Sequence, residues 1–230
     1  MKHIKSLGIV LARTNYGEAD RIITFLTPAH GKVRALAKSV RKQKSKLAGG
    51  IELFSISNLS FVEGRGEIKT LTGSRLAKYY SHIVEDLERT RAGYELIRLL
   101  NKATEDAADP GYFILAENAF AALDDKAVSL EVAELWFHCR LIRLSGHGPN
   151  LRTDTNGDEF QPKAKYNFDF SRMAFEPAAK GGFSASQIKF LRLNFNSNQP
   201  RIINRIAGST DLASATAPLV NSILQTFVRV

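Results

Sequence analysis

The sequence of 230 residues lacks residue types that several protein classes require. Its single cysteine, Cys139, can form neither an internal disulfide nor a cysteine pair for zinc. No apolar run approaches the roughly 18 residues of a membrane span, and the first residues are too polar for a signal peptide, so we expect a cytoplasmic protein without membrane contact. The remaining composition, 44% apolar and 24% charged, is typical of one large or two small globular domains.

Acidic residues are missing from one long segment. Between Arg21 and Ile51 there is no Asp or Glu. Residues 1–80 contain 15 Lys and Arg against 5 Asp and Glu, whereas residues 81–230 contain 17 against 18, so the first segment carries the whole net charge of +9. An evenly mixed basic surface would serve solubility alone, but segregation on this scale favours a polyanionic partner.

The first eighty residues have the pattern of a small β-barrel. Short β-branched or alternating runs, separated by turn residues, occur at 6–14, 21–27, 32–38, 53–63 and 67–73. Five short strands in such a length predict a five-stranded OB-fold β-barrel, a fold that commonly binds single-stranded nucleic acid. We therefore expect an α+β protein with an OB-fold nucleic-acid-binding domain at residues 1–80.

From residue 81 the apolar residues follow a helical period, which predicts an α-helical C-terminal domain over 81–230. Helical segments are expected at 81–103, 112–123, 130–144, 184–195 and 217–228. The first carries the stripe Ile83, Leu87, Tyr94, Ile97 and Leu100, and the third, with Ser129 as N-cap, carries Val132, Leu135, Trp136, Cys139 and Ile142. Residues 146–182 lose this period and are predicted to be loop, with a short hairpin around "YNFDF".

Few residues suggest catalysis. No phosphate-binding loop of the Gly-x-x-x-x-Gly-Lys-Ser/Thr type is present, and a hairpin turn accounts for Gly64-Arg65-Gly66. His138 and Cys139 are adjacent, so on a helix they diverge by about 100° and make a poor metal pair. A binding protein is therefore favoured over an enzyme, with an active site in the helical domain as a remote alternative.

The basic segment has a pattern suited to a sugar–phosphate backbone. On the strand 32–38, Val33, Ala35 and Ala37 fall on one face, and Lys32, Arg34 and Lys38 fall on the other. Four more cations follow on what we expect to be a mobile extension: Arg41, Lys42, Lys44 and Lys46. Four aromatics lie in this region, namely Tyr16, Phe25, Phe54 and Phe61. Phe25 and at least one of Phe54 and Phe61 are expected in the core, and none of the four is assigned to base stacking.

The order of these motifs resembles the amino-terminal domain of the bacterial RecO family of recombination mediators. The matching motifs are "YGEADR" before an apolar strand, "HGKVRALAK", the basic tail and "GRGEIKTL"; "YELIRLL", "GHGP" and "SASQIKFLR" match the helical part more loosely. The resemblance implies a non-enzymatic factor of DNA repair and homologous recombination in the bacterial cytoplasm, associated with the nucleoid.

The resemblance also implies an activity and a set of partners. Members of the family bind single- and double-stranded DNA, anneal complementary strands, act with RecR, recognise the acidic tail of single-stranded DNA-binding protein, and help to load the recombinase RecA. Carried over to this sequence, the DNA contacts are Arg34, Lys38, Arg41, Lys42, Lys44 and Lys46. An RNA-binding module of the translation apparatus remains the alternative, since OB barrels also bind RNA.

Two further expectations concern the helical part. Arg140 and Arg143, beside the apolar stripe of 130–144, are candidates for receiving the acidic tail of single-stranded DNA-binding protein. Many family members carry a four-cysteine zinc site in the loop-rich part, but here Thr153 and Asn156 stand about where the first cysteine pair would be. We therefore predict no zinc and no cofactor, and expect this loop either to be held by packing of Tyr166, Phe168, Phe170 and Phe175 or to be looser than in zinc-bearing relatives.

Overall fold

A computed structural model describes residues 2–64, 66–104 and 109–228 of the chain. It divides into two compact units, residues 1–126 and 127–230. Each unit is built around its own buried core. None of the helices within the described ranges is both long enough and apolar enough to cross a lipid bilayer.

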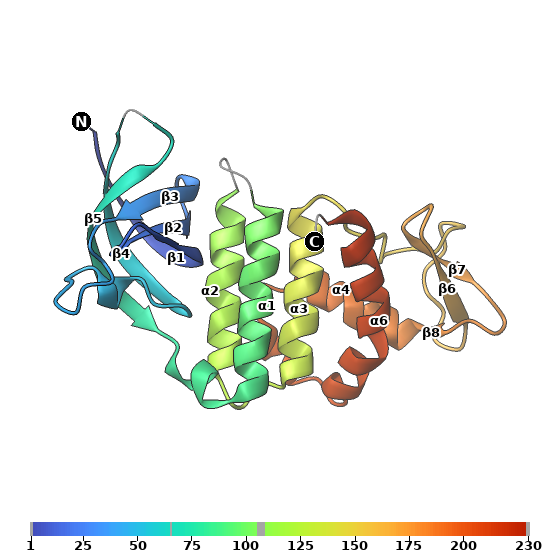
Figure 1. The fold of residues 1–230 in the computed structure, drawn as a ribbon. Helices are drawn as coiled ribbons and strands as arrows, with labels where there is room; N and C mark the ends of the chain where they lie inside the picture. The colour runs from blue at the N-terminus through green and yellow to red at the C-terminus, as the bar shows by residue number, and fades with distance from the viewer. Residues whose placement is uncertain (1, 65, 105–108, 229–230) are drawn as a thin grey trace. The chain divides into compact units, whose positions relative to one another are not determined.

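Unit 1 begins with a closed five-stranded barrel in the order β1-β2-β3-β5-β4 (Figure 1). Its strands are β1 (His3–Tyr16), β2 (Asp20–Thr27), β3 (Gly31–Ala37), β4 (Ser55–Val62) and β5 (Lys69–Tyr79). All neighbours pair antiparallel except β3 and β5, which pair parallel through Ala35↔Lys69 and Leu36↔Thr70. This barrel, followed by helices, confirms the predicted α+β class and the OB-fold barrel.

Alternation along β3 places its apolar residues in the barrel and its cations outside. Val33, Ala35 and Ala37 are buried in the core with Phe25 and Phe61, whose rings meet edge to face at 5.8 Å. Phe25 was predicted in the core with at least one of Phe54 and Phe61, and all three are buried, so this prediction is confirmed. The strand pattern therefore fixes which side chains of β3 reach solvent.

Two helices complete unit 1, namely α1 (Leu87–Ala103) and α2 (Pro110–Asp124), after a short 3-10 turn η2 (Ser81–Glu85). Phe54 packs edge to face on Tyr94 and Phe120, and a Cβ on Gly93 of α1 would come within 2.6 Å of the Phe54 ring. Glycine at this position thus lets the helix approach the barrel's Phe54 closely.

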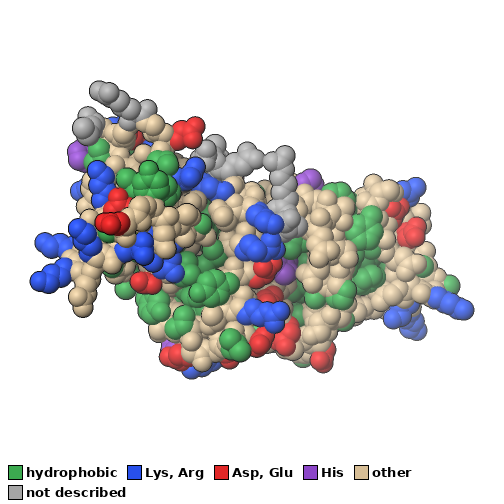
Figure 2. Space-filling view, viewed as in Figure 1, with side chains coloured by type: hydrophobic (Ala, Val, Ile, Leu, Met, Phe, Trp, Pro, Cys, Tyr) green, Lys and Arg blue, Asp and Glu red, His purple; other side chains and the backbone are tan. Residues whose placement is uncertain are grey.

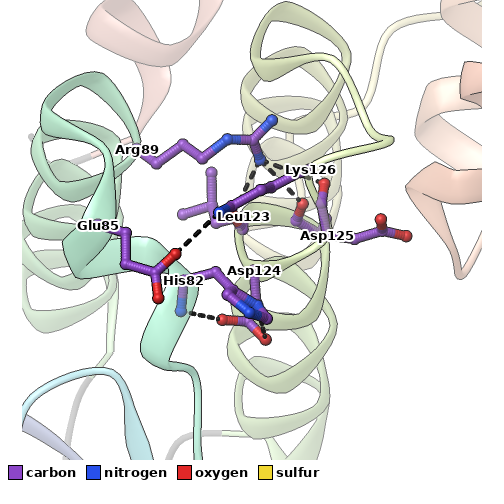
Figure 3. A network of polar contacts seen from close by, with 8 residues as sticks. His82, Glu85, Arg89, Leu123, Asp124, Asp125 and Lys126 are labelled. Atoms are coloured by element: carbon purple, nitrogen blue, oxygen red, sulfur yellow. Dashed lines mark hydrogen bonds and ion pairs between the residues drawn. The ribbon is translucent and has the colours of Figure 1, made fainter.

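A polar network ties η2 and α1 to the end of α2 (Figure 3). The buried Arg89 donates to the carbonyl oxygens of Leu123 and Asp125, at 2.9 and 3.3 Å, and so satisfies groups that a helix end leaves unpaired. The Asp124 carboxylate accepts the backbone N–H of His82, and Lys126 pairs with Glu85 at 2.8 Å. These contacts fix the chain where it passes from barrel to helices.

Unit 2 contains α3 (Leu130–Leu144), α4 (Ala185–Asn196), α5 (Pro200–Asn204) and α6 (Ser209–Phe227). The side chain of Ser129 caps α3 by accepting the N–H of Val132, and the whole predicted stripe of α3 is buried. Trp136, fully buried, donates its indole N–H to the carbonyl of Ser197 at 3.0 Å. The predicted core face of α3 is therefore confirmed.

Between α3 and α4 lies a small sheet in the order β7-β6-β8, formed by β6 (Lys165–Asp169), β7 (Ala174–Pro177) and β8 (Phe183–Ser184). The predicted hairpin around "YNFDF" is β6 with β7, paired through Phe168↔Phe175. Phe175 is fully buried and meets three rings edge to face, those of Phe160, Phe168 and Phe183. Tyr166 in turn meets Phe160 edge to face.

Several predicted boundaries were wrong. The strand expected at 67–73 runs from Lys69 to Tyr79, the first helix begins at Leu87, and the last begins at Ser209 rather than at 217. Leu87 and Tyr94, predicted on the apolar stripe of the first helix, are 80% and 53% exposed. Asp86 accepts the N–H of Arg89 as N-cap, so the helix begins after Ile83, which lies in η2. The buried face of α1 is formed instead by Ala92, Leu96, Ile97, Leu99 and Leu100.

Candidate nucleic-acid interface

The basic residues singled out from the sequence gather on one part of the barrel surface. This group, called here the basic surface, consists of two cations of β3 and its end and four of the loop that follows: Arg34, Lys38, Arg41, Lys42, Lys44 and Lys46. All six are exposed, and none forms an ion pair with another residue in the part of the chain that the structure describes. Figure 2 shows Lys and Arg side chains protruding from this side of the barrel.

The loop of residues 38–50 is anchored at both ends, which corrects the expectation of a free extension. At its start, Ser39 donates its N–H to the Asp20 carboxylate at 2.6 Å, and Arg41 donates its N–H to the carbonyl of Ala19 at 2.9 Å. At its end, the carbonyl of Leu47 accepts the Ser74 hydroxyl at 2.7 Å. Anchoring of this kind holds the cations in a defined surface rather than on a loose arm.

An exposed aromatic that the sequence did not single out lies beside this loop. Tyr16 ends β1 at the turn to β2 and is 55% exposed. The same turn receives the loop, since the guanidinium of Arg41 donates to the carbonyl of Glu18 at 3.0 Å. Phe25, Phe54 and Phe61 are buried. Of the four aromatics named in this region of the sequence, Tyr16 is therefore the one that can offer a ring face to a base.

The two arginines proposed for partner binding have structural contacts. Arg140 and Arg143 each donate to the carbonyl of Phe195 at 3.0 Å, and Arg143 also bonds the side chain of Asn196, so both stabilise the C-terminal end of α4. Partial burial, and next the nearby Arg143, lower the pKa of Arg140 from its usual value. Arg143 also borders a pocket of about 280 Å³, together with Arg152 and Arg192.

The loop-rich region does not offer the ligands of a zinc site. Thr153 accepts a hydrogen bond from the side chain of Asn150 at 3.1 Å, and the buried Asp154 accepts the N–H groups of Asn156 and Asp158 at 2.8 and 3.1 Å. These polar groups are therefore occupied by the turn itself, and no thiolate is present to replace them. The residues present do not fit the four-cysteine zinc of the family.

Signs of catalytic chemistry are sparse among the described residues. No group of three or more His, Cys, Asp or Glu side chains within those ranges could hold a metal ion. Cys139 is fully buried, and burial raises the pKa of its thiol well above the usual value, which disfavours the reactive thiolate. His147 stacks on Phe227 at 5.5 Å.

Comparison with known proteins assigns both halves of the chain. The family model described as "Recombination protein O N terminal" matches residues 1–80, and the one described as "Recombination protein O C terminal" matches residues 84–227. The chain is similar to the DNA repair protein RecO of Dehalococcoides mccartyi strain 195, with 35% identity over 66% of this chain and 60% of the relative. It is also similar to that of Streptomyces coelicolor, with 38% identity over 63% of this chain and 61% of the relative.

The chain thus spans about three fifths of the length of the curated relatives it matches. The two family models lie end to end along it, the first over the barrel and the second over the helices and the small sheet. From these matches, the chain belongs to the recombination protein O (RecO) family.

Proposed function

We propose that the chain is a DNA repair and recombination mediator that binds single- and double-stranded DNA through the basic surface. One observation carries the proposal: six exposed cations, without acidic partners among the described residues, follow one another along β3 and its anchored loop. Cations spaced along a path suit phosphates that repeat along a strand, and they require no base-specific geometry. On this proposal residues 1–80 are the nucleic-acid-binding domain and residues 81–230 the helical domain.

Strand annealing follows from the same surface. Two complementary strands repel each other as polyanions, and a dense positive surface lowers that repulsion without any covalent step. Family membership supports the remaining parts of the proposal: cooperation with RecR and loading of RecA onto DNA coated with single-stranded DNA-binding protein, in the bacterial cytoplasm at the nucleoid. We propose binding, not catalysis, as the whole activity.

The test is a charge reversal with a matched control. Arg41, Lys42, Lys44 and Lys46 are replaced together by Glu, and single-stranded DNA binding and annealing are measured against the unmodified protein. The control replaces four exposed cations of unit 2 by Glu, which changes the net charge equally: Lys163, Lys180, Lys189 and Arg205. We expect loss of both activities in the first variant alone; unchanged binding and annealing would refute the proposal.

RNA is the competing ligand, because a sequence-independent basic surface attracts both nucleic acids. A competition between single-stranded DNA and RNA of equal sequence and length separates the two functions. We expect DNA to compete at least as well as RNA. A clear preference for RNA would favour a module of the translation apparatus.

We propose that the acidic tail of single-stranded DNA-binding protein binds unit 2 at the pocket beside Arg143. Arginines border this pocket from three segments, namely Arg143, Arg152 and Arg192, and Leu151 and Phe195 add apolar surface. Guanidinium groups bind carboxylates in bidentate fashion, and apolar walls suit the hydrophobic part of such a tail. Arg140 supports the site by stabilising α4, where its guanidinium also bonds Asn198.

Because Arg140 and Arg143 stabilise α4, reversing their charge would confuse binding with folding. Arg152→Glu/Arg192→Glu, titrated with a peptide of the tail, is the sharper test. We expect at least tenfold weaker binding, as for the loss of a charge-assisted hydrogen bond. Undiminished binding would place the tail elsewhere, and Lys163→Glu/Lys189→Glu is the matched control.

A further inference from the structure

A second basic site lies in unit 1, at the end of β3 away from the loop of residues 38–50. It is a pocket of about 520 Å³, bordered by the cations Lys2, Lys32, Arg34 and Lys69 and by His30. Of these residues only Arg34 belongs to the basic surface. The volume lies within the range of small-molecule sites and accommodates a unit the size of a nucleotide.

The pocket follows from the way the barrel closes. β3 begins at Gly31, but its pairing with β5 is limited to Ala35↔Lys69 and Leu36↔Thr70. Residues 32–34 pair with β2 on one side and have no β5 residue opposite them on the other. The pairing between β3 and β5 is therefore absent before Ala35, which leaves room for the pocket. Ile4 and Val33 form the apolar part of the pocket wall.

Positive side chains outnumber negative ones in the pocket. Two carboxylates, Glu63 and Glu67, face the four cations. The side chain of Lys69 bonds Glu63 at 3.2 Å, and that of Lys32 donates to the carbonyl of Asn101 at 2.6 Å, whereas the guanidinium of Arg34 bonds no other residue that the structure describes.

The surroundings of Glu63 report the same excess of positive charge. The hydrogen bond from Lys69 lowers the pKa of the Glu63 carboxyl, and the charges of Lys69, Lys2 and His30 act in the same direction. Lys69, Lys2 and His30 therefore favour a negative charge at the place of the Glu63 carboxyl. An anion would therefore be attracted there.

We propose that this pocket binds the phosphomonoester at the end of a nucleic-acid strand, which gives the chain a preference for phosphorylated strand ends. The proposal rests on the proposed function, because the strand itself is held by the basic surface. Lys2 and Lys69 are the new residues it assigns, and Arg34 would be shared by the two sites.

Both charge and shape favour a strand end over the middle of a strand. A terminal phosphate carries nearly two negative charges at neutral pH, compared with one for an internal phosphodiester, so it gains more from the convergent cations. Glu63 and Glu67 also line the pocket, so each further phosphate that a continuous strand brought into it would meet like charges. A strand end, in contrast, brings only its terminal phosphate into the pocket.

The experiment compares three DNA strands of one sequence, about ten nucleotides long to suit one OB barrel, with an internal fluorophore. The strands carry hydroxyls at both ends, a 5′-phosphate, or a 3′-phosphate. Their dissociation constants are measured by anisotropy at fixed salt with the unmodified chain, with Lys2→Gln/Lys69→Gln, and with the matched control Lys5→Gln/Arg75→Gln on the same barrel. Neither pair belongs to the basic surface.

We expect one phosphorylated strand to bind about tenfold more tightly than the hydroxyl strand, as for one added charge-assisted contact. This preference should vanish in Lys2→Gln/Lys69→Gln and persist in the control. Equal affinities for the three strands, or a preference that survives Lys2→Gln/Lys69→Gln, would overturn the pocket and leave the proposed function intact. Failure of the unmodified chain to bind any strand would overturn both.

Discussion

The thiol of Cys139 shows how burial decides the chemistry of one residue. It is fully buried on α3, in the apolar stripe that also contains Trp136 and Ile142. Because burial raises the pKa of the thiol, and because reagents cannot reach it, we expect no reaction with an aromatic disulfide reagent at neutral pH in the folded chain. Absorbance should rise by one thiol per chain once denaturant is added, and rapid reaction before denaturation would contradict the burial of α3.

Tyr16 should contribute to the binding of single-stranded DNA but not to the binding of double-stranded DNA. Its ring is exposed beside the basic surface and can stack on an unpaired base, which a duplex does not offer. Tyr16→Ala should weaken single-stranded binding by about tenfold, since one stacked base contributes roughly 1–3 kcal/mol. Duplex binding should change little, and Tyr79→Ala, which removes another exposed ring, on β5, is the control. Equal losses for both DNA forms would rule out stacking.

At the scale of elements, the small sheet of unit 2 depends on one close approach. A Cβ on Gly181 would lie 2.4–2.5 Å from backbone atoms of Tyr166 in β6, whereas a Cβ on Gly182 would meet nothing within 4 Å. Gly181→Ala should therefore lower the free energy of unfolding by about 1–3 kcal/mol, as overpacking does, and Gly182→Ala should change it little. Urea unfolding followed by circular dichroism measures both; equal stability of the two variants would contradict this packing.

The stability of the same small sheet should not depend on a bound metal. Rings around Phe175 form the interior of the loop-rich region, and its polar groups are bonded within the turn at Asp154. Dialysis against a strong chelator should leave the melting temperature unchanged, and metal analysis should find no stoichiometric zinc. Phe175→Ala, in contrast, should cost about 3–5 kcal/mol of stability through the cavity it creates. One zinc per chain would overturn this account.

How far the sequence predicts these elements depends on where the stabilising contacts lie. The barrel strands and α3 follow from alternation and from an apolar stripe, because their burial is local in pattern. The first half of α6 does not: Ala213 and Thr216 are buried there, but small and polar residues such as these leave no apolar period to read. The Thr216 hydroxyl is satisfied by the carbonyl of Leu212 at 2.7 Å, a contact visible only in the fold.

The sequence shows where the cations of the basic surface lie along the chain, but not how they are arranged in space. The gap in acidic residues marks the basic segment in the sequence, and the family resemblance assigns the six cations as DNA contacts, which stays a prediction. The anchoring of their loop depends on Asp20 and Ser74, and the exposure of Tyr16 depends on the turn that receives Arg41. These are contacts between segments distant in sequence, so no local pattern carries them.

For the whole molecule, the distribution of charge sets how binding responds to salt. The excess charge belongs to residues 1–80, while the rest of the chain is close to neutral, so counterion release should come from the barrel alone. If about five of the six cations contact phosphates of a single strand, the logarithm of affinity should fall with the logarithm of salt concentration with a slope of roughly −3.5.

The same relation measures what each part of the surface contributes. Replacing Arg41, Lys42, Lys44 and Lys46 together by Gln removes four contacts without adding repulsion, so the slope should fall in magnitude to roughly −0.7. The equivalent replacement of Lys163, Lys180, Lys189 and Arg205 lowers the net charge equally but removes no contact, and it should leave the slope near that of the unmodified chain. Equal slopes for the two variants would mean that net charge, and not the anchored loop on the barrel, drives binding. Titrations of a fluorescent strand over a range of salt concentrations distinguish these outcomes.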